Sequence, residues 1–204
     1  MEPQRSEAWY EARRGMVTAS CFADACTKGR GTAMSKTAES LLYALLAEHL
    51  TGELRTPAKA KALDWGVQYE DEAIAAYEFS TGNLVTSEGF LLHPLEPMIG
   101  GSPDGLVGEE GLIEVKCPYN SQVHVKTMVT REIPSEYIPQ VDGNLWVTGR
   151  EWCDFISYDP RMNKNSLVVI RRERDEAAIN KLANSVRRFR DRLQELIDEY
   201  GAVE

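Results

Sequence analysis

The sequence predicts an α/β (α+β) fold in which helices flank a central mixed β-sheet, organised as a single domain over residues 1–204. Two observations carry this prediction. Apolar residues recur at helical spacing in the first part of the chain and again near its C-terminus, and short β-rich runs bounded by Pro and Gly appear from residue 90 onward. A chain of 204 residues, 43% of them hydrophobic, can bury one sizeable core.

Two helices are expected in the first part of the chain. Ser35 can cap a helix that ends at Thr51-Gly52. The apolar stripe of this helix consists of Leu41, Leu42, Leu45, Leu46 and Leu50. Asp64 can cap a second helix that runs from Trp65 to about Ser80 and ends at Thr81-Gly82.

The pattern then changes to short extended segments. We expect strands over residues 90–93, 98–99, 105–107, 112–117, 152–158 and 167–172. Helical patterns occupy residues 121–130, 135–147 and 175–200. Large aromatic residues at inward spacings are expected in the core; they are Trp65, Tyr69, Trp146 and Trp152.

The charge of the chain narrows the possible functions. A net charge of −9 argues against a protein that coats nucleic acid, because phosphate binding depends on Lys and Arg. A local site is still possible, and basic residues gather at residues 13–14, 28–30 and 59–61. A further group is expected to form a solvated face; it consists of Arg171, Arg172, Arg174, Arg187 and Arg188.

The sequence favours a soluble cytoplasmic protein with no membrane association. It contains no run of roughly 18 apolar residues, the minimum for a membrane span, and its first residues lack an apolar signal stretch. Its cysteines form no Cys-x-x-Cys pair, so core thiols in a reducing compartment are expected. The histidines share no spacing, and we assign them no metal role.

A carboxylate motif dominates the middle of the chain. Asp104, in a Ser-Pro-Asp-Gly segment, lies ten residues before Glu114. The turn over residues 108–111 should fold Asp104 back beside Glu114. Strand alternation then places Glu114 and Lys116 on one face together with Leu112, and Val115 on the other. Burying acids in this way is costly, and a divalent cation is the natural compensator.

These residue types suit phosphodiester hydrolysis. Mg²⁺ polarises a phosphate and lowers the pKa of an attacking water, and hard oxygen ligands from Asp and Glu bind this ion. Lys116 could orient or deprotonate the water, or balance charge near the phosphate. Asp104 alone could be an ordinary Pro-Asp-Gly turn, and Glu114 with Lys116 could be an exposed cross-strand salt bridge. The combination at this spacing favours the metal site.

Glu70 is the third candidate ligand. It shares a helix face with Val67, Ala73, Ile74 and Tyr77, so an acid interrupts what should be an inward apolar stripe. An acid in this position needs a partner. A structural salt bridge to Arg or Lys is the alternative to a role in metal binding.

Around these residues the sequence resembles the phage lambda exonuclease family, also called YqaJ-like viral recombinases, within the nucleases that carry a PD-(D/E)xK motif and a restriction-endonuclease-like fold. The resemblance covers nearly the whole chain. An isolated PD…ExK match is weak, but an ordered series of segments is specific. The segments are residues 9–15, 17–20, 60–70, 102–106, 114–118, 139–141, 145–148 and 158–162.

The resemblance implies a double-stranded DNA exonuclease of phage or prophage origin that acts in the bacterial cytoplasm. Members degrade the 5′-ended strand, leave a 3′ overhang for recombination by strand annealing, form ring-shaped homotrimers and work with a single-strand annealing protein. The cofactor would be Mg²⁺, with Mn²⁺ as an expected substitute.

The resemblance also assigns roles to individual residues. The metal ligands would be Glu70, Asp104, Glu114 and the backbone carbonyl of Val115, with Lys116 as the catalytic lysine. A pocket for the terminal 5′-phosphate would consist of Arg13, Ser20, Ser102 and Gln140. Leu63 would act as a wedge that splits the terminal base pair. Lys28 and Arg30 would contact DNA, although the loop over residues 27–35 is shorter than expected for the family.

The residue types of the predicted phosphate pocket are coherent with its role. The guanidinium of Arg13 offers a planar fork for phosphate oxygens, whereas Ser and Gln supply neutral donors. Without the resemblance, Ser20 could simply continue a helix cap begun at Thr18, and Gln140 could be a surface residue.

Two other functions compete with the exonuclease. An endonuclease of the same fold would cut internally, but a pocket for a terminal phosphate is useful only at ends. A non-catalytic module that binds DNA ends would have lost an acid or the lysine, and the sequence retains all of them.

Overall fold

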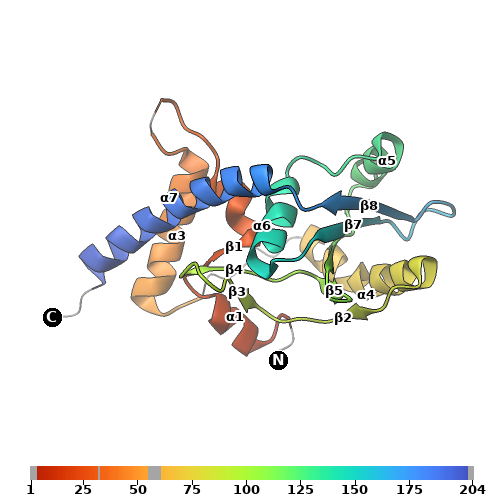
Figure 1. The fold of residues 1–204 in the computed structure, drawn as a ribbon, viewed down its shortest axis with the longest axis horizontal. Helices are drawn as coiled ribbons and strands as arrows, with labels where there is room; N and C mark the ends of the chain where they lie inside the picture. The colour runs from red at the N-terminus through yellow and green to blue at the C-terminus, as the bar shows by residue number, and fades with distance from the viewer. Residues whose placement is uncertain (1–3, 32, 55–60, 202–204) are drawn as a thin grey trace.

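The computed structural model of the chain describes residues 4–31, 33–54 and 61–201. Figure 1 shows α3 and α7 at one end of the molecule, and β7, β8 and α4 toward the other. The helices are α1 (Glu7–Arg13), α2 (Phe22–Ala25), α3 (Lys36–Thr51), α4 (Lys61–Thr81), α5 (Ser121–Thr130), α6 (Ile138–Thr148) and α7 (Glu176–Tyr200), with a 3₁₀ turn, η1 (Ala19–Cys21). The strands are β1 (Val17–Thr18), β2 (Val85–Thr86), β3 (Leu91–Leu92), β4 (Ile99–Gly101), β5 (Gly105–Val107), β6 (Gly111–Lys116), β7 (Trp152–Tyr158) and β8 (Leu167–Glu173).

Within the described residues the strands form two sheets. The larger sheet has the order β2-β5-β6-β7-β8, in which β6 and β7 are parallel and the other neighbours are antiparallel. This confirms the predicted mixed sheet with flanking helices. A small sheet of order β1-β4-β3 lies beside it and was not predicted. Strands β1 and β2 were missed because two residues are too few to show alternation.

The buried side chains form one cluster on each face of the larger sheet. Leu112 of β6 belongs to the cluster that α3, α6 and α7 cover. Ile113 and Val115 belong to the second cluster, together with Ala73 and Tyr77 of α4. The predicted alternation along β6 is therefore confirmed, and it decides which side chains of this strand face α6 and which face α4.

Side chains cap the N-termini of α3 and α7. Ser35 Oγ accepts a hydrogen bond from Ala38 N at 3.1 Å, and Asp175 caps α7 in the same way. The prediction for Asp64 was wrong: α4 begins at Lys61, so Asp64 lies in the first turn. Leu50 is 45% exposed, contrary to its place in the predicted stripe, because it lies in the last turn of α3, beyond the buried cluster.

The prediction of a solvated arginine face holds only in part: Arg171 and Arg188 are exposed, whereas the other three arginines are partly buried. Arg171 and Arg172 form ion pairs with the buried carboxylates of Asp154 and Asp142. Arg174 Nη1 donates to Leu145 O at 2.6 Å, and Arg187 pairs with Glu96. A sequence cannot show which distant acids face a strand, so buried partners for these arginines were not foreseen.

Other predictions about the core hold. Cys117 and Cys153 are buried, Cys21 and Cys26 are partly buried, and all four are free thiols. Trp146 is buried, whereas Trp65, Tyr69 and Trp152 are partly buried against the α4 side of the sheet. No helix in the described part of the chain has the length and apolar character needed to cross a membrane.

Candidate active site

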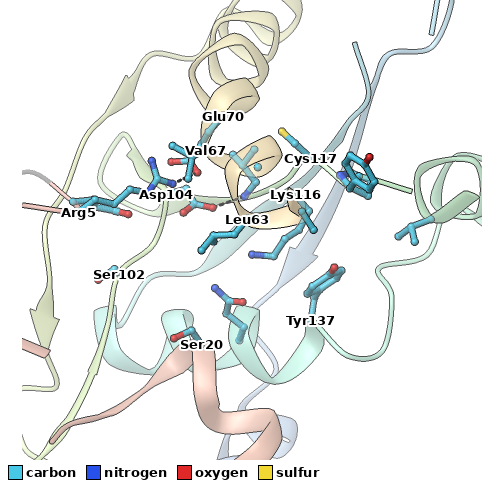
Figure 2. A pocket seen from close by; sticks show the side chains of 18 of the residues that line it. Arg5, Ser20, Leu63, Val67, Glu70, Ser102, Asp104, Lys116, Cys117 and Tyr137 are labelled. Atoms are coloured by element: carbon cyan, nitrogen blue, oxygen red, sulfur yellow. Dashed lines mark hydrogen bonds and ion pairs between the residues drawn. The ribbon is translucent and has the colours of Figure 1, made fainter. Parts of the chain in front are cut away.

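A cavity of about 630 Å³ opens where β6 ends, between α4, α6 and the N-terminal segment. Figure 2 shows Arg5, Glu70 and Asp104 side by side, with Leu63 and Lys116 pointing into the same space. The candidate residues among its lining side chains are Arg13, Ser20, Leu63, Glu70, Ser102, Asp104, Val115, Lys116 and Gln140. The fold therefore brings into one cavity residues that lie up to 127 positions apart, from Arg13 to Gln140 (140 − 13).

Asp104 is held beside the end of β6 by the predicted turn. Its N–H donates to Ile113 O at 3.1 Å, and its Oδ2 accepts from Val115 N at 2.6 Å. Gly108, with φ of +54°, supplies the left-handed residue that the tight turn between β5 and β6 requires. Because the N–H and C=O of a strand residue point to the same edge, the Val115 carbonyl also faces the edge where Asp104 lies.

Glu114 lies deeper than Asp104. Its side chain is 0% exposed, which excludes the alternative of an exposed cross-strand salt bridge. Oε1 pairs with Lys116 Nζ, and Oε2 accepts a hydrogen bond from Asn144 Nδ2 at 3.0 Å. Asn144 fits because Gly101 has no side chain: a Cβ at Gly101 would lie 2.5 Å from Asn144 Oδ1.

Glu70 reaches the cavity from α4 and forms an ion pair with Arg5. The predicted inward stripe holds for Ala73 and Tyr77, which are fully buried, but Val67 is exposed at the cavity. The first turns of α4 therefore line the cavity and only the later turns pack on the sheet. The alternative partner for Glu70, a basic residue, is present in the structure.

The three acids resist ionisation in this arrangement. Burial and the negative charge of Glu114 raise the pKa of Asp104 to about 7. Burial and Asp104 likewise raise the pKa of Glu70. Burial also raises the pKa of Glu114, against the opposing effect of Lys116. Surplus negative charge is thus concentrated at the end of β6.

The pKa of Lys116 is also raised, which for a lysine favours the charged form. Burial alone would lower its pKa, but Glu114 and Asp104 outweigh this effect and raise the pKa above its usual value. Its Nζ also lies 5.3 Å from the ring centroid of Tyr137. Without a bound cation, Lys116 therefore acts as the positive partner of Glu114 and Asp104.

The donor set of the cavity matches a hard divalent cation. Three carboxylates influence one another's ionisation, and the Val115 carbonyl faces the same edge of β6. Among the described residues, no three His, Cys, Asp or Glu side chains are placed closely enough to hold a metal ion together. Glu70 pairs with Arg5, and Glu114 pairs with Lys116.

A second polar group lies beside the acids and carries a positive charge. Arg13 Nη1 donates to Ser102 Oγ at 3.0 Å, and Nη2 donates to Ser20 Oγ at 3.1 Å. Trp9 Nε1 donates to the same Ser102 oxygen at 3.1 Å, and the guanidinium carbon of Arg13 lies 4.1 Å from the Trp9 ring centroid. The geometry brings together three of the four residues predicted for the phosphate pocket.

The remaining candidates divide into two groups. Gln140, in the first turn of α6, lines the cavity, and so does Leu63 of α4, whose side chain is 49% exposed. Lys28 and Arg30 lie between α2 and α3 and do not line the cavity. Lys59, in the third basic cluster, lies outside the described residues.

Sequence reasoning missed several residues of this site. Arg5 precedes α1 and carried no pattern that pointed to Glu70. Asn144 left little signal, because Asp142 is also polar in the same short stretch between Val141 and Leu145, and the sequence does not say which of the two faces Glu114. Trp9 belongs to a segment that carried the family resemblance, but its contact with Ser102 could not be seen in the sequence.

Comparison with known proteins identifies the family. Residues 8–151 match the model of the YqaJ-like viral recombinase domain. The chain belongs to this family. It is similar to the crystal structure of an alkaline exonuclease, LHK-Exo, from Laribacter hongkongensis, with 38% identity, 95% of both chains covered and a TM-score of 0.87. The structure of LHK-Exo in complex with dAMP matches with a TM-score of 0.88.

Two curated proteins match over shorter segments. The ExoD protein of Escherichia coli K12 is 34% identical over 71 residues, which cover 35% of this chain and 82% of that protein. Protein R354 of Acanthamoeba polyphaga mimivirus is 28% identical over 108 residues, 47% of this chain. The matched segment spans 20% of the length of R354.

Proposed function

We propose that this chain is a metal-dependent double-stranded DNA exonuclease that degrades the 5′-ended strand and leaves a 3′ single-stranded overhang. One observation carries the proposal: Glu70, Asp104 and the partly buried Lys116 line the same cavity as the arginine–serine group, while Glu114 lies fully buried behind Lys116. Similarity to LHK-Exo, an alkaline exonuclease, across 95% of both chains supports the exonuclease activity. The fold that the two proteins share supports the same assignment.

In this proposal Glu70, Asp104, Glu114 and the Val115 carbonyl hold Mg²⁺ or Mn²⁺. The ion, when bound, supplies Lewis-acid activation of the phosphate and of a water. Lys116, whose Nζ pairs with Glu114, would orient or deprotonate the attacking water or balance negative charge on the phosphate. Asn144 keeps the Glu114 carboxylate in place through its hydrogen bond to Oε2.

End recognition follows from the arginine–serine group. A terminal 5′-phosphate carries up to about two negative charges near neutral pH, and a guanidinium can bind its oxygens in a fork. Arg13, Ser20, Ser102 and Gln140 supply donors on the wall of the cavity. Each cleavage creates a new 5′-phosphate, so this pocket would draw the strand forward. The exposed Leu63 side chain would part the terminal base pair.

The proposal includes a ring-shaped homotrimer. A monomer with a net charge of −9 has little hold on DNA, whereas a closed homotrimer would gather basic residues, including Lys28 and Arg30, around one channel. Sedimentation at micromolar concentration should show three subunits. A processive monomer would contradict the ring. The overhang would pass to a single-strand annealing protein in phage-type recombination within the host cytoplasm.

The test is degradation of linear duplex DNA labelled at either end, with and without a 5′-phosphate and with and without Mg²⁺. We expect early release of a 5′ label, late release of a 3′ label and no release without a divalent cation. A closed circular duplex is the control substrate. Cutting of the circle would favour the endonuclease, and binding of ends without any release would favour the non-catalytic module.

A further inference from the structure

The segment 158–162 carried part of the family resemblance but contributes no side chain to the cavity. Its centre is an ion pair between Asp159, whose side chain is fully buried, and Arg161. Arg161 Nε donates to Asp159 Oδ1 at 2.7 Å and Nη2 donates to Oδ2 at 2.9 Å. Burying a carboxylate is costly, so a fully buried Asp159 calls for a reason even though Arg161 is 41% exposed.

The free edge of the Arg161 guanidinium points to the loop that follows β6. Nη1 donates to Tyr119 O at 3.0 Å and Nη2 donates to Pro118 O at 3.1 Å. Burial alone would raise the pKa of Asp159, but hydrogen bonds from Arg161 and Ser121 outweigh this effect and lower the pKa to about 2. The pair is therefore ionised at neutral pH, and two carbonyls of the loop are fixed by a charged donor.

Trp65 of α4 packs against the same loop. The guanidinium carbon of Arg161 lies 4.4 Å from the Trp65 ring centroid. The rings of Trp65 and Tyr119 meet edge to face, with centroids 5.8 Å apart and an interplanar angle of 83°. Asn120, the next residue, caps α5 by accepting from Gln122 N at 3.0 Å. Tyr119 is thus fixed through its carbonyl, through its ring contact with Trp65 and through the helix that follows it.

This well-fixed aromatic side chain is nevertheless exposed. Tyr119 is 50% exposed and lines the cavity beside the apolar side chains of Leu63 and Val67. It lies three residues after Lys116, so the extended-chain rise allows at most about 10 Å between the two residues. An aromatic side chain fixed within this reach of Lys116 has the properties of a stacking surface.

We propose that Tyr119 is the platform on which an unpaired nucleobase of the strand end stacks, and that Arg161 is the positioning residue that fixes it. The proposal rests on the proposed exonuclease function. Every base has a π-face, so the platform would accept all four bases, as an enzyme that degrades any sequence requires. Loss of one stacking contact should weaken binding of a frayed DNA end on the order of tenfold.

The test uses 2-aminopurine at the first, second or third position of the 5′ strand, because its fluorescence falls when the base stacks. Binding is measured in the Lys116→Ala background, which prevents cleavage. In the bound state, we expect the fluorescence at one of these positions to be low with Tyr119 and with Tyr119→Phe, and clearly higher with Tyr119→Ala, where the unpaired base has no ring to stack on. Tyr43→Ala is the matched control, since Tyr43 is 56% exposed and does not line the cavity.

Steady-state degradation, measured with Lys116 intact, adds a second readout. Tyr119→Ala should raise KM about tenfold and change kcat less, whereas Tyr119→Phe should match the wild type. Arg161→Lys keeps the charge but not the fork, so it should share the KM effect while melting near the wild-type temperature. Tyr119→Ala with wild-type quenching and KM would overturn the platform.

The two proposals can fail separately. If the wild type degrades labelled duplexes but Tyr119→Ala quenches 2-aminopurine as the wild type does, the platform alone is wrong. If DNA ends bind and quench through Tyr119 but no nucleotide is released, the exonuclease function alone is wrong.

Discussion

Two groups of buried acids in this protein differ in how their charge is balanced. Asp142, Asp154 and Asp159 each meet an arginine through two hydrogen bonds. For Asp154, Arg171 donates to both oxygens at 2.8 Å. The pairs of Asp142 and Asp154 join different elements of the fold, and the pair of Asp159 lies within the loop after β7. We call these three residues the structural acids.

The acids of the cavity lack this balance. Glu70, Asp104 and Glu114 lie close enough to raise one another's pKa, and the cations that oppose this effect are Lys116 and Arg5. Asp104 accepts its hydrogen bond from a backbone N–H. We infer that the charge of the structural acids is balanced within the protein, whereas the charge of the cavity acids is available to a divalent cation.

The largest expected effect on the exonuclease rate comes from substitutions of the cavity acids and of Lys116. Asp104→Ala, Glu114→Ala or Lys116→Ala should lower the exonuclease rate on the order of a thousandfold or more, because each removes a metal ligand or the ammonium beside it. Single-turnover degradation of an end-labelled duplex measures this loss. Circular dichroism should show an intact fold. A wild-type rate in any of the three variants would contradict the site assignment.

Replacing a structural acid should lower stability and leave metal binding unchanged. Asp154 also accepts a hydrogen bond from Tyr77 Oη at 2.7 Å, so Asp154→Ala leaves both the Tyr77 hydroxyl and Arg171 without this partner. We expect a loss of about 3 kcal/mol in the free energy of unfolding. Urea denaturation measures it. An unchanged denaturation midpoint would show that the two groups of acids do not differ in the way described.

Arg13 tests the phosphate pocket. If its charge-assisted contact is worth roughly 1.5 to 3 kcal/mol, Arg13→Ala should slow 5′-phosphorylated ends about ten- to a hundredfold and leave hydroxyl ends little changed. Arg14→Ala is the matched control, because Arg14 pairs with Glu11 at 3.2 Å and bonds to Gly52 O, away from the cavity. Equal slowing of both substrates would leave the end-recognition role without support.

The smallest effect concerns stability without metal. The pKa of Asp104 rises from 3.8 to about 7 on folding, so between these values the folded protein holds a proton that the unfolded chain has lost. Its contribution to stability is fully present below pH 3.8 and is lost as pH rises through 7. Asp104→Asn has no carboxyl group to ionise, so it does not lose this stability as pH rises. At pH 8 in a chelator it should be more stable by about 2 kcal/mol, or roughly 4 to 8 °C.

Thermal melting at pH 8 and pH 5 measures this difference. At pH 5, where the folded wild type keeps the proton, most of the advantage of Asp104→Asn should disappear. An advantage of the same size at both pH values would show that the charge of Asp104 is not its cause.

Most long elements of the fold could be predicted from the sequence, because they carry their own local signals. Ser35 and Gly52 define α3, and alternation along β6 separates Leu112 from Ile113. The misses depend on partners distant in the chain. The ion pair of Arg172 with Asp142 needs the register of β8 against α6, which no local pattern supplies.

The same division applies to the cavity. Asp104 and Glu114 were predicted to meet because one turn joins their strands, and the structure confirms this contact at Val115. The ion pair of Arg5 with Glu70 joins two segments 65 residues apart and left no signal. The predicted metal, phosphate and wedge roles stay predictions until they are measured.

Calorimetric titration of Mn²⁺ at pH 8 tests the central claim most directly. The wild type should bind the ion, Asp104→Ala should bind it at least tenfold more weakly, and Asp142→Asn, which alters a structural acid, should bind it as the wild type does. No binding to the wild type, or equal binding to the wild type and Asp104→Ala, would contradict the claim that the cavity acids form a metal site.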